Sequence, residues 1–412
     1  LGASFLVVSS LPGWAGDLPG QAPDPAMRIC SAFGRGYFYI PGSDLCLNIG
    51  GRVRFEILVN EVWSRAQSSI GYRSRGRFDF DARTQTDYGR LRATMQLQST
   101  WSSGAYGSSG PAYDKDPGNP ENRNVLQRAF IEFAGMTAGR FISFFDFYGN
   151  DLNWGGTLGS SRGPINGLAY TASFASGLST TLSLENTTNR TVAQDNFAAT
   201  GSWIPEIVGA ARLDQTWGSL QLSGALHALR PLSTEDFTEG STQFGWAIQG
   251  GVKINLPVLA KGDVIWGQAA FAQGAINYLG FSRNSFRVGR LRYTVSDAFF
   301  ANNTMQLTTG YSLTGAFSHY WTPIIQQSVF ASYGQLDPTG PAAAAIPLAS
   351  KAGLWQIGSN LIWTPIKDLE IGGELLWYQL SGSKTVASTD PGYSALNRDN
   401  AYQFRARIQR DF

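Results

Sequence analysis

Apolar and polar residues alternate along most of this chain, from about residue 47 to residue 412. In the first alternating segment, 47–59, one parity is apolar and the other is polar or charged. The polar parity of this segment holds Asn48, Arg52, Arg54 and Glu56. Successive side chains of a β-strand point to opposite faces of a sheet, so the pattern predicts a strand with one apolar and one charged face.

The same pattern recurs in sixteen segments, most of them about 9 to 14 residues long. They lie near 47–59, 77–87, 90–99, 125–134, 138–145, 168–174, 178–186, 207–214, 218–227, 242–254, 263–276, 304–316, 319–332, 353–364, 368–380 and 401–412. Strands of soluble β-proteins average about five or six residues, whereas a strand that crosses a bilayer needs about 9 to 11. The segment lengths therefore favour strands that cross a membrane.

The connections between these segments alternate between long and short. The long connections are 60–76, 100–124, 146–167, 187–206, 228–241, 277–303, 333–352 and 381–400. Short connections between them include 87–89, 135–138, 175–177, 215–219 and 364–368. Long outside loops and short periplasmic turns are typical of bacterial outer-membrane barrels, which have an even number of strands. A soluble β-sandwich is not expected to place all its long loops at one end of the sheet and all its short turns at the other.

Aromatic residues gather near the predicted ends of the segments. The short-turn ends carry Tyr88, Phe133, Phe174, Trp217, Trp321, Trp363 and Phe412, and the opposite ends carry Trp63, Trp101, Tyr278 and Trp377. Girdles of aromatic residues at the two lipid headgroup levels would have this distribution. The general abundance of aromatics in strands explains their presence but not their placement.

The composition supports an all-β fold. Apolar residues make up 43% of the chain and charged residues 15%, yet no stretch approaches the roughly 20 consecutive apolar residues of a spanning helix. Within hydrocarbon every backbone N–H and C=O must be hydrogen-bonded, so a protein that spans with strands has to close on itself. We therefore predict a transmembrane antiparallel β-barrel of about 16 strands over residues 47–412. The net charge of +2 argues against a nucleic-acid partner.

The residues before the barrel have a different pattern. Residues 1–15 form a short apolar run that ends in small residues, as in a signal-peptide remnant, with a buried N-terminal strand as the alternative. We expect the mature protein to start near Gly16 and residues 16–46 to form a periplasmic segment. Cys30 and Cys46 are the only cysteines, so export to an oxidising compartment predicts a disulfide between them, with two reduced buried thiols as the alternative.

Residues 30–54, CSAFGRGYFYIPGSDLCLNIGGRVR, resemble the N-terminal signature of the alphaproteobacterial general porins. The shared features are a cysteine, a Gly-rich aromatic stretch, YIPG, a second cysteine, and IGG before an arginine. The preceding GDLPGQAP is similar to the start of the mature protein in that family. The terminal Phe412 resembles the C-terminal aromatic signal that the insertion machinery for bacterial outer-membrane proteins reads.

This resemblance implies a sixteen-stranded homotrimer in the bacterial outer membrane, whose third long loop, 146–167, folds into the barrel. It implies a passive water-filled channel through which small hydrophilic solutes and ions diffuse. Such porins place carboxylates on the constriction loop, and the candidates here are Asp146 and Asp151. Outer-membrane lipids and lipopolysaccharide are the expected surroundings. We interpret Asp114, Asp116 and Glu121 in the second long loop as solvated residues, with a bridge to lipopolysaccharide or a contact with a neighbouring subunit as the alternatives.

Arginines are concentrated on the inward parity of the first four predicted strands. They are Arg52, Arg54, Arg77, Arg83, Arg90, Arg92 and Arg128. A barrel of this size leaves an aqueous lumen whose lining sets its selectivity. A basic wall opposite an acidic loop would produce a transverse field that orients dipolar solutes. The alternative for each arginine is a structural ion pair with Asp79, Asp81 or Glu56 on the same or an adjacent strand.

Other functions find less support in the sequence. A channel specific for sugars or small anions should also carry an aromatic track along its inner wall, and we locate none. An outer-membrane hydrolase needs a nucleophile beside a histidine base, such as Ser223 with His227, but no acidic signature accompanies them. The other histidine, His319, falls in a predicted short turn. A structural or adhesion barrel would have a plugged lumen.

No cofactor or metal ion is expected. The chain has no His/Cys cluster with metal-ligand spacing. The Gly-rich run 155–163 lacks the Lys-Ser/Thr of a phosphate-binding loop, and we interpret it as turns in the constriction loop.

Overall fold

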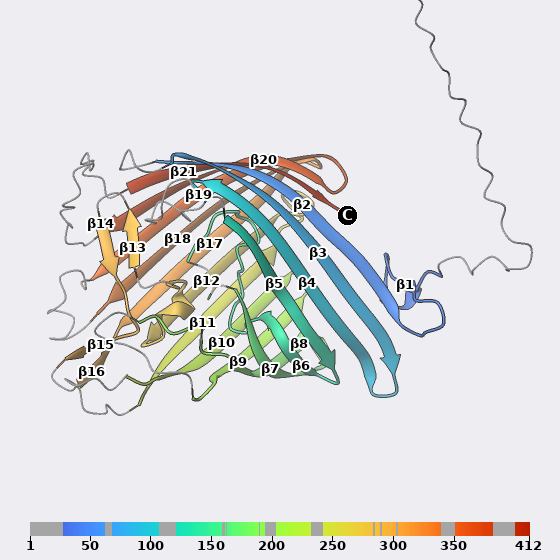
Figure 1. The fold of residues 1–412 in the computed structure, drawn as a ribbon, viewed down its shortest axis with the longest axis horizontal. Coiled ribbons are helices and arrows are strands. Elements are labelled where there is room, and N and C mark those ends of the chain that lie inside the picture. The colour runs from blue at the N-terminus through green and yellow to red at the C-terminus, as the bar shows by residue number, and fades with distance from the viewer. Residues whose placement is uncertain are drawn as a thin grey trace, which may run out of the picture.

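Strands, most of them long enough to cross a bilayer, form a barrel in the computed structural model of this chain (Figure 1). The structure describes residues 28–61, 68–106, 121–158, 161, 163–188, 190–193, 203–231, 242–282, 285–288, 291–301, 304–338, 351–381 and 400–412. The predicted signal-peptide remnant, 1–15, lies outside these residues, as do Gly16, Trp63, Asp114 and Asp116.

Sixteen antiparallel strands of the described chain close into the barrel. They are β2 (Cys46–Asn60), β3 (Ile70–Thr86), β4 (Gly89–Gly104), β5 (Glu121–Phe133), β6 (Met136–Ile142), β7 (Pro164–Ser173), β8 (Leu178–Glu185), β9 (Glu206–Gln215), β10 (Gly218–Leu229), β11 (Gln243–Asn255), β12 (Val264–Gln273), β17 (Thr309–Thr322), β18 (Ile325–Asp337), β19 (Ala352–Ile366), β20 (Leu369–Ser381) and β21 (Asn400–Asp411). Each pairs with its successor, and β21 pairs with β2, where Asp411 lies opposite Arg52. Closure leaves this series of strands without an unpaired edge.

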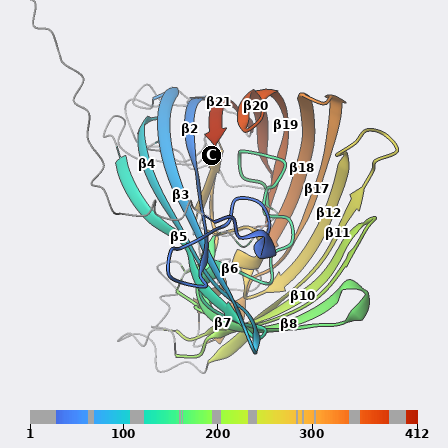
Figure 2. The same cartoon turned by 90° about the vertical axis from the view of Figure 1, so that its right-hand side faces the viewer.

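The alternation of side chains separates the outer face of the barrel from the inner face. On β10, Leu220 and Leu222 are exposed, whereas Gln221 and Ser223 point inward and are buried. The exposed apolar residues suit contact with lipid acyl chains. Figure 2 looks into the barrel from the end where the chain terminates and shows the strands surrounding coil segments.

The prediction of an antiparallel barrel of about 16 strands is confirmed. Among the four strands predicted to carry the arginines, β3 differs most from its predicted bounds, because it begins at Ile70 rather than at residue 77. Ser74 and Gly76 occupy the outward parity at its start, so the apolar half of the alternation is weak there.

The predicted strand 304–316 is confirmed from Thr309 onward, but its predicted start is wrong. Thr304–Leu307 forms β16, which pairs with β15 (Ala298–Ala301) in a hairpin outside the barrel sheet, and β17 begins at Thr309. The predicted break before residue 319 is also wrong, because β17 continues to Thr322. Aromatic residues stand on both parities in AFSHYW at 316–321, so the alternation does not mark the turn.

The long connection after β12 contains most of the irregular structure. It holds the 3-10 helix η3 (Ile276–Leu279), the hairpin of β13 (Ser285–Val288) with β14 (Leu291–Thr294), and the hairpin of β15 with β16. Tyr278, which we placed in an interfacial girdle, lies in η3 and is 2% exposed. That placement was wrong because η3 packs inside the barrel. No helix in the described residues is long and apolar enough to cross a membrane.

The segment before β2 packs at the short-turn end of the barrel (Figure 2). The predicted disulfide between Cys30 and Cys46 is confirmed. Phe38 and Tyr39 form β1, which pairs with the first residues of β2. The ring of Tyr37 stacks beneath the Arg83 guanidinium, whose carbon lies 4.7 Å from the ring centroid. The segment is thereby fastened to the inner face of β3.

Candidate channel lining

Arginine side chains line the inner face of the neighbouring strands β2 to β5. All seven arginines predicted for this basic wall lie on the inward parity of these strands. They form rows across the sheet because antiparallel pairing puts residues of equal parity opposite one another. Successive rows on β2 and β3 pair Arg52 with Arg77, Arg54 with Arg75 and Glu56 with Arg73.

Most of these arginines are also ion-paired. Arg52 pairs with Asp411, Arg77 with Asp79, Arg83 and Arg92 with Asp81, and Arg92 also with Glu132, at 2.5 to 3.0 Å. These four arginine side chains are nevertheless 18% to 25% exposed, although they point into the barrel. The two interpretations of the cluster therefore coexist: the arginines form structural ladders and also face water.

Sequence reasoning missed five arginines of the same wall. Arg123 precedes the predicted start of β5 and lies opposite Thr100 on the inner face. Arg73 and Arg75 precede the predicted start of β3, and Arg405 and Arg407 stand on β21, which closure brings next to β2. The carboxylate of Glu56 is fully buried and accepts from Arg73 at 2.6 Å and from Arg407 at 2.7 Å. The polar parity of 401–412 was visible in the sequence, and pairing the last strand with the first would have found its arginines.

The connection between β6 and β7 folds into the barrel. The Trp154 N–H donates to the Glu374 carboxylate on β20 at 2.6 Å, and the Leu158 N–H donates to Ser332 Oγ on β18 at 3.1 Å. These strands lie far around the ring from β6 and β7. The described part of the predicted constriction loop therefore crosses the lumen and binds the opposite inner face.

The two predicted loop carboxylates have different surroundings. Asp146 Oδ1 accepts hydrogen bonds from the backbone and hydroxyl of Ser161, at 2.7 and 2.6 Å, and so holds the loop together. Asp151 is exposed, and the charges that act on it are those of Lys253 on β11 and Arg212 on β9. The carboxylates that pair with the predicted arginines stand on the strands and are those of Asp79, Asp81, Glu132 and Asp411. The role of Asp146 and Asp151 in a transverse field stays a prediction.

The inner face from β10 to β20 carries small polar residues in place of arginines. Buried members of this face are Gln221, Ser223, Gln249, Gln268, Ser312, Thr314, Ser318, Ser328, Ser332, Gln356 and Asn360, at 0% to 8% exposure. Several bind the loop backbone: Ser223 and Gln249 both donate to the Phe145 carbonyl at 2.8 Å, and Thr314 donates to Leu158 at 3.0 Å. This wall holds the loop and is shielded by it.

A second connection, the one after β12, also enters the barrel. The ring of Tyr278 lies 4.5 Å from that of Phe145 in the constriction loop, and Arg190 stacks on Tyr278 at 4.7 Å. Asp297 is fully buried and accepts from the N–H groups of Val192 and Ile276, at 2.5 and 2.8 Å. Burial raises the pKa of the Asp297 carboxyl to about 6, although the charge of His227 opposes the rise.

The geometry around His227 does not resemble a hydrolase site. Its Nδ1 lies 2.6 Å from Glu206 Oε1 and its Nε2 lies 3.7 Å from Asp297, and the ring is 1% exposed. Ser223 is four residues away on the same strand face, about 13 Å along the strand, and its hydroxyl donates to Phe145. The proposed nucleophile and base are thus kept apart. His319 lies in β17 rather than in a turn, with Nδ1 2.6 Å from Asp263.

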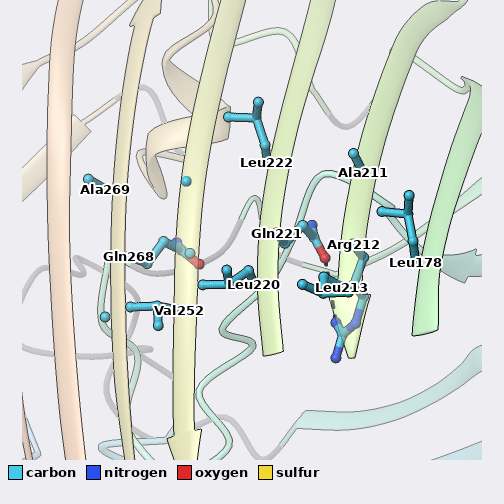
Figure 3. Close-up of a pocket in the computed structure, with 13 residues that line it drawn as sticks. Leu178, Ala211, Arg212, Leu213, Leu220, Gln221, Leu222, Val252, Gln268 and Ala269 are labelled. Atoms are coloured by element: carbon cyan, nitrogen blue, oxygen red, sulfur yellow. Dashed lines mark hydrogen bonds between the residues drawn. The ribbon is translucent and has the colours of Figure 1, made fainter. Parts of the chain in front are cut away.

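A pocket of about 570 Å³ lies over β8 to β12 (Figure 3). Figure 3 shows Leu178, Leu213, Leu220 and Leu222 from neighbouring strands around it. Leu178, Leu220 and Leu222 are exposed on the outer face, so this hollow belongs to the lipid-facing surface and not to the lumen. It forms where Ala211, Gly250, Gly267 and Ala269 leave space between larger side chains. No group of three or more His, Cys, Asp and Glu side chains in the described residues could hold a metal ion.

Comparison with known proteins gives a consistent result. Residues 19–404 match the model of the porin subfamily. Porin Omp2a of Brucella ovis is 28% identical over 236 residues, which cover 53% of this chain and 67% of that porin, so the chain matches about two thirds of the relative's length.

Solved structures share the fold at low identity. The outer membrane channel DcaP of Acinetobacter baumannii superposes with a TM-score of 0.65 at 14% identity, covering 91% of this chain and 99% of that chain. The trimer form of OmpT, an outer membrane protein of Vibrio cholerae, has a TM-score of 0.51 at 9% identity, covering 90% of this chain and 100% of that chain.

Proposed function

Because the chain belongs to the porin subfamily, we propose that it is a passive, non-enzymatic channel through which small hydrophilic solutes and ions cross the bacterial outer membrane. The observation that carries the proposal is the partial exposure of inward-pointing arginines. Arg52, Arg77 and Arg92 keep about a quarter of their side-chain surface accessible although the barrel encloses them. Water-filled space therefore runs along β2 to β5, between the basic wall and the constriction loop.

The experiment is a single-channel recording of the purified protein in a planar bilayer under a salt gradient. The proposal predicts a conductance in the nanosiemens range in molar salt. A conductance far below that range would contradict an open channel and favour a plugged, structural barrel. The sign of the reversal potential reports whether the arginines or the loop carboxylates dominate the lumen.

We further propose that the protein assembles as a homotrimer, with the outer face of β6 to β8 turned towards a second copy. β6 has seven residues and β8 has eight, fewer than the about 9 to 11 that span a bilayer. Arg140 stands on the outward parity of β6, between the exposed Met136 and Ile142, and its Nε donates to the Leu126 carbonyl at 2.8 Å. A guanidinium facing acyl chains is costly, so this face suits protein contact.

The assembly is tested by light scattering of the detergent-solubilised protein and two charge-reversal variants. R140E should yield monomers. R410E changes another outward arginine bound to a backbone carbonyl, at the short-turn end of β21, and should remain trimeric. A monomeric wild-type protein, or equal behaviour of the two variants, would contradict this proposal while leaving the channel proposal intact.

A further inference from the structure

In one row of the basic wall the two facing arginines have no carboxylate at ion-pair distance. Arg54 on β2 and Arg75 on β3 lie directly opposite each other, in the middle of their strands, and both point into the lumen. The row continues to Gln409 on β21 and Glu370 on β20 on one side, and to Thr100 on β4 and Arg123 on β5 on the other. Arg54 donates from Nε and Nη2 to Gln409 Oε1, at 2.8 and 2.5 Å, and Arg75 donates from Nε to Thr100 Oγ1 at 3.3 Å. Both acceptors are neutral, and the Gln409 amide in turn donates to Glu370 at 3.2 Å and to Asp411 at 3.3 Å.

The neighbouring rows differ in this respect. In the next row of inward residues towards the short turns, Arg52 and Arg77 also lie opposite each other, but each forms an ion pair with its own aspartate. Nearer the short turns, Arg83 and Arg92 share Asp81. Among the described rows of two facing arginines, the Arg54–Arg75 row alone lacks a carboxylate at ion-pair distance.

The surroundings add further positive charge to this row. The charges of Arg407, Arg52 and Arg75 act unfavourably on the guanidinium of Arg54, and the charge of Glu56 opposes them. The next row towards the long loops contains the carboxylate of Glu56, which already forms ion pairs with Arg73 and Arg407. Guanidinium cannot lose its proton at any relevant pH, so the excess charge cannot be relieved by titration. An anion from solution would relieve it.

We propose that Arg54 and Arg75 form a binding site for a dianionic oxyanion group, a phosphate, on the inner wall of the channel. The terminal NH₂ groups of Arg75 and the Arg54 Nη1 make no hydrogen bond within the described residues, so planar donors remain available from both sides of the row. Two guanidinium groups that approach from adjacent strands match the tetrahedral oxygens of phosphate, which accept bidentate hydrogen bonds.

The constriction loop places this row at the narrowed part of the lumen. One row nearer to the long loops, the guanidinium carbon of Arg407 lies 4.1 Å from the centroid of the Trp154 ring. The Trp154 carbonyl accepts a hydrogen bond from Arg405. A solute that passes the loop tip from the long-loop end therefore next reaches Arg54 and Arg75, which have no carboxylate partner. The site would raise the local concentration of phosphate-bearing solutes and favour their passage over that of cations. This inference rests on the proposed channel function.

The experiment measures chloride current through single channels of the full-length protein while inorganic phosphate is added at constant ionic strength. We expect phosphate to reduce the chloride current at low concentration in the wild-type channel. In R54Q/R75Q the half-inhibitory phosphate concentration should rise at least about ten-fold, since two charge-assisted contacts are lost. R54K/R75K keeps the two positive charges but loses the planar guanidinium groups that donate two parallel hydrogen bonds. Its half-inhibitory phosphate concentration should lie between those of the wild type and R54Q/R75Q.

The matched control is R83Q/R92Q, which removes two facing arginines of the same wall. Arg83 lies eight residues along β3 from Arg75, about 27 Å away and beyond a Debye length of about 10 Å at 0.1 M salt. Its half-inhibitory phosphate concentration should therefore stay close to the wild-type value. Equal losses in both double variants, or a wild-type current that phosphate does not reduce, would overturn the site.

Two further probes identify the form of the ligand. Glucose 6-phosphate should act like phosphate if the site takes a phosphate group carried by a solute, whereas glucose should have no effect. If free phosphate acts and glucose 6-phosphate does not, the site holds the free ion only, which overturns the claim that it recognises phosphorylated solutes. A wild-type protein that carries no chloride current at all contradicts the channel function itself, a result distinct from failure of the site.

Discussion

The two inner walls of the barrel are built from the same alternating pattern but are used differently. On β2 to β5 the inward residues are mostly long and charged, and four ion-paired arginines remain 18% to 25% exposed. On β10 to β20 they include small polar residues, such as Ser223 and Ser332, each 2% exposed, together with apolar ones such as Leu376. One wall meets water, and the other meets the loop that folds in from β6 and β7.

The difference shows how a wide barrel acquires a defined passage. Hydroxyl and amide side chains hold several backbone groups of the loop without introducing charge, and the Glu374 carboxylate holds the loop tip. A buried polar group that finds its partner costs little. Arginines stay charged in any environment, so they suit the wall that remains hydrated. The hydrated arginines and the hydroxyl and amide anchors of the loop thus lie on opposite sides of the ring, although Arg405 of the basic wall also binds the Trp154 carbonyl.

The largest expected effect comes from releasing the loop tip. Glu374 is 1% exposed and accepts from the N–H groups of Trp154 and Gly155, each at 2.6 Å. E374A should cost about 3 to 5 kcal/mol in urea unfolding, because a buried charged acceptor is lost and its donors stay unsatisfied. The same variant should raise the channel conductance. E374Q, which keeps one acceptor and the side-chain volume, should lose less; identical behaviour of E374A and wild type would show that the loop is held elsewhere.

A change of pH should have a smaller effect, on the local stability of the connection after β12. The pKa of Asp297 lies near 6, above its ordinary value of 3.8, so the folded protein binds this proton more tightly than the unfolded chain. Its contribution to stability is therefore complete below about pH 4 and is lost as pH rises through about 6, by up to about 3 kcal/mol. Glu206, His227 and Tyr278 face the same buried site.

Hydrogen exchange of the Val192 and Ile276 amides measures this local stability, because both donate to Asp297. Protection should increase as pH falls from 7 to 4, after correction for intrinsic exchange rates. In D297N the dependence should flatten. Protection that decreases on acidification would mean that the carboxylate is stabilised by its partners and would contradict the assignment.

The smallest effect should come from the hydrated wall. Arg52 and Asp411 are 25% and 36% exposed, and exposed pairs contribute about 0 to 1 kcal/mol. The charge-neutral variant R52Q/D411N should therefore unfold within about 1 kcal/mol of the wild type in urea. A loss comparable to that of E374A would show that both walls are equally buried.

Sequence patterns predicted the strands better than they predicted the interior. Alternation and loop length located the barrel, the basic wall and the segment that becomes the constriction loop, because a bilayer imposes a fixed length and an apolar outer face on each strand. Arg73 and Arg75 were missed because Ser74 and Gly76 weaken the apolar parity beside them. The contacts of Glu374 with Trp154 join positions 220 residues apart, and no periodicity encodes such pairs.

The central claim, that water follows the arginine wall and the loop seals the other, is tested most directly by cysteine accessibility in the open channel. Thr100 on β4 and Thr314 on β17 both point inward, one in the Arg75 row and the other hydrogen-bonded to Leu158 at 3.0 Å. An anionic methanethiosulfonate reagent should react rapidly with T100C and lower the conductance, and should leave T314C unmodified. Equal reaction of both cysteines, or faster reaction of T314C, would contradict the claim.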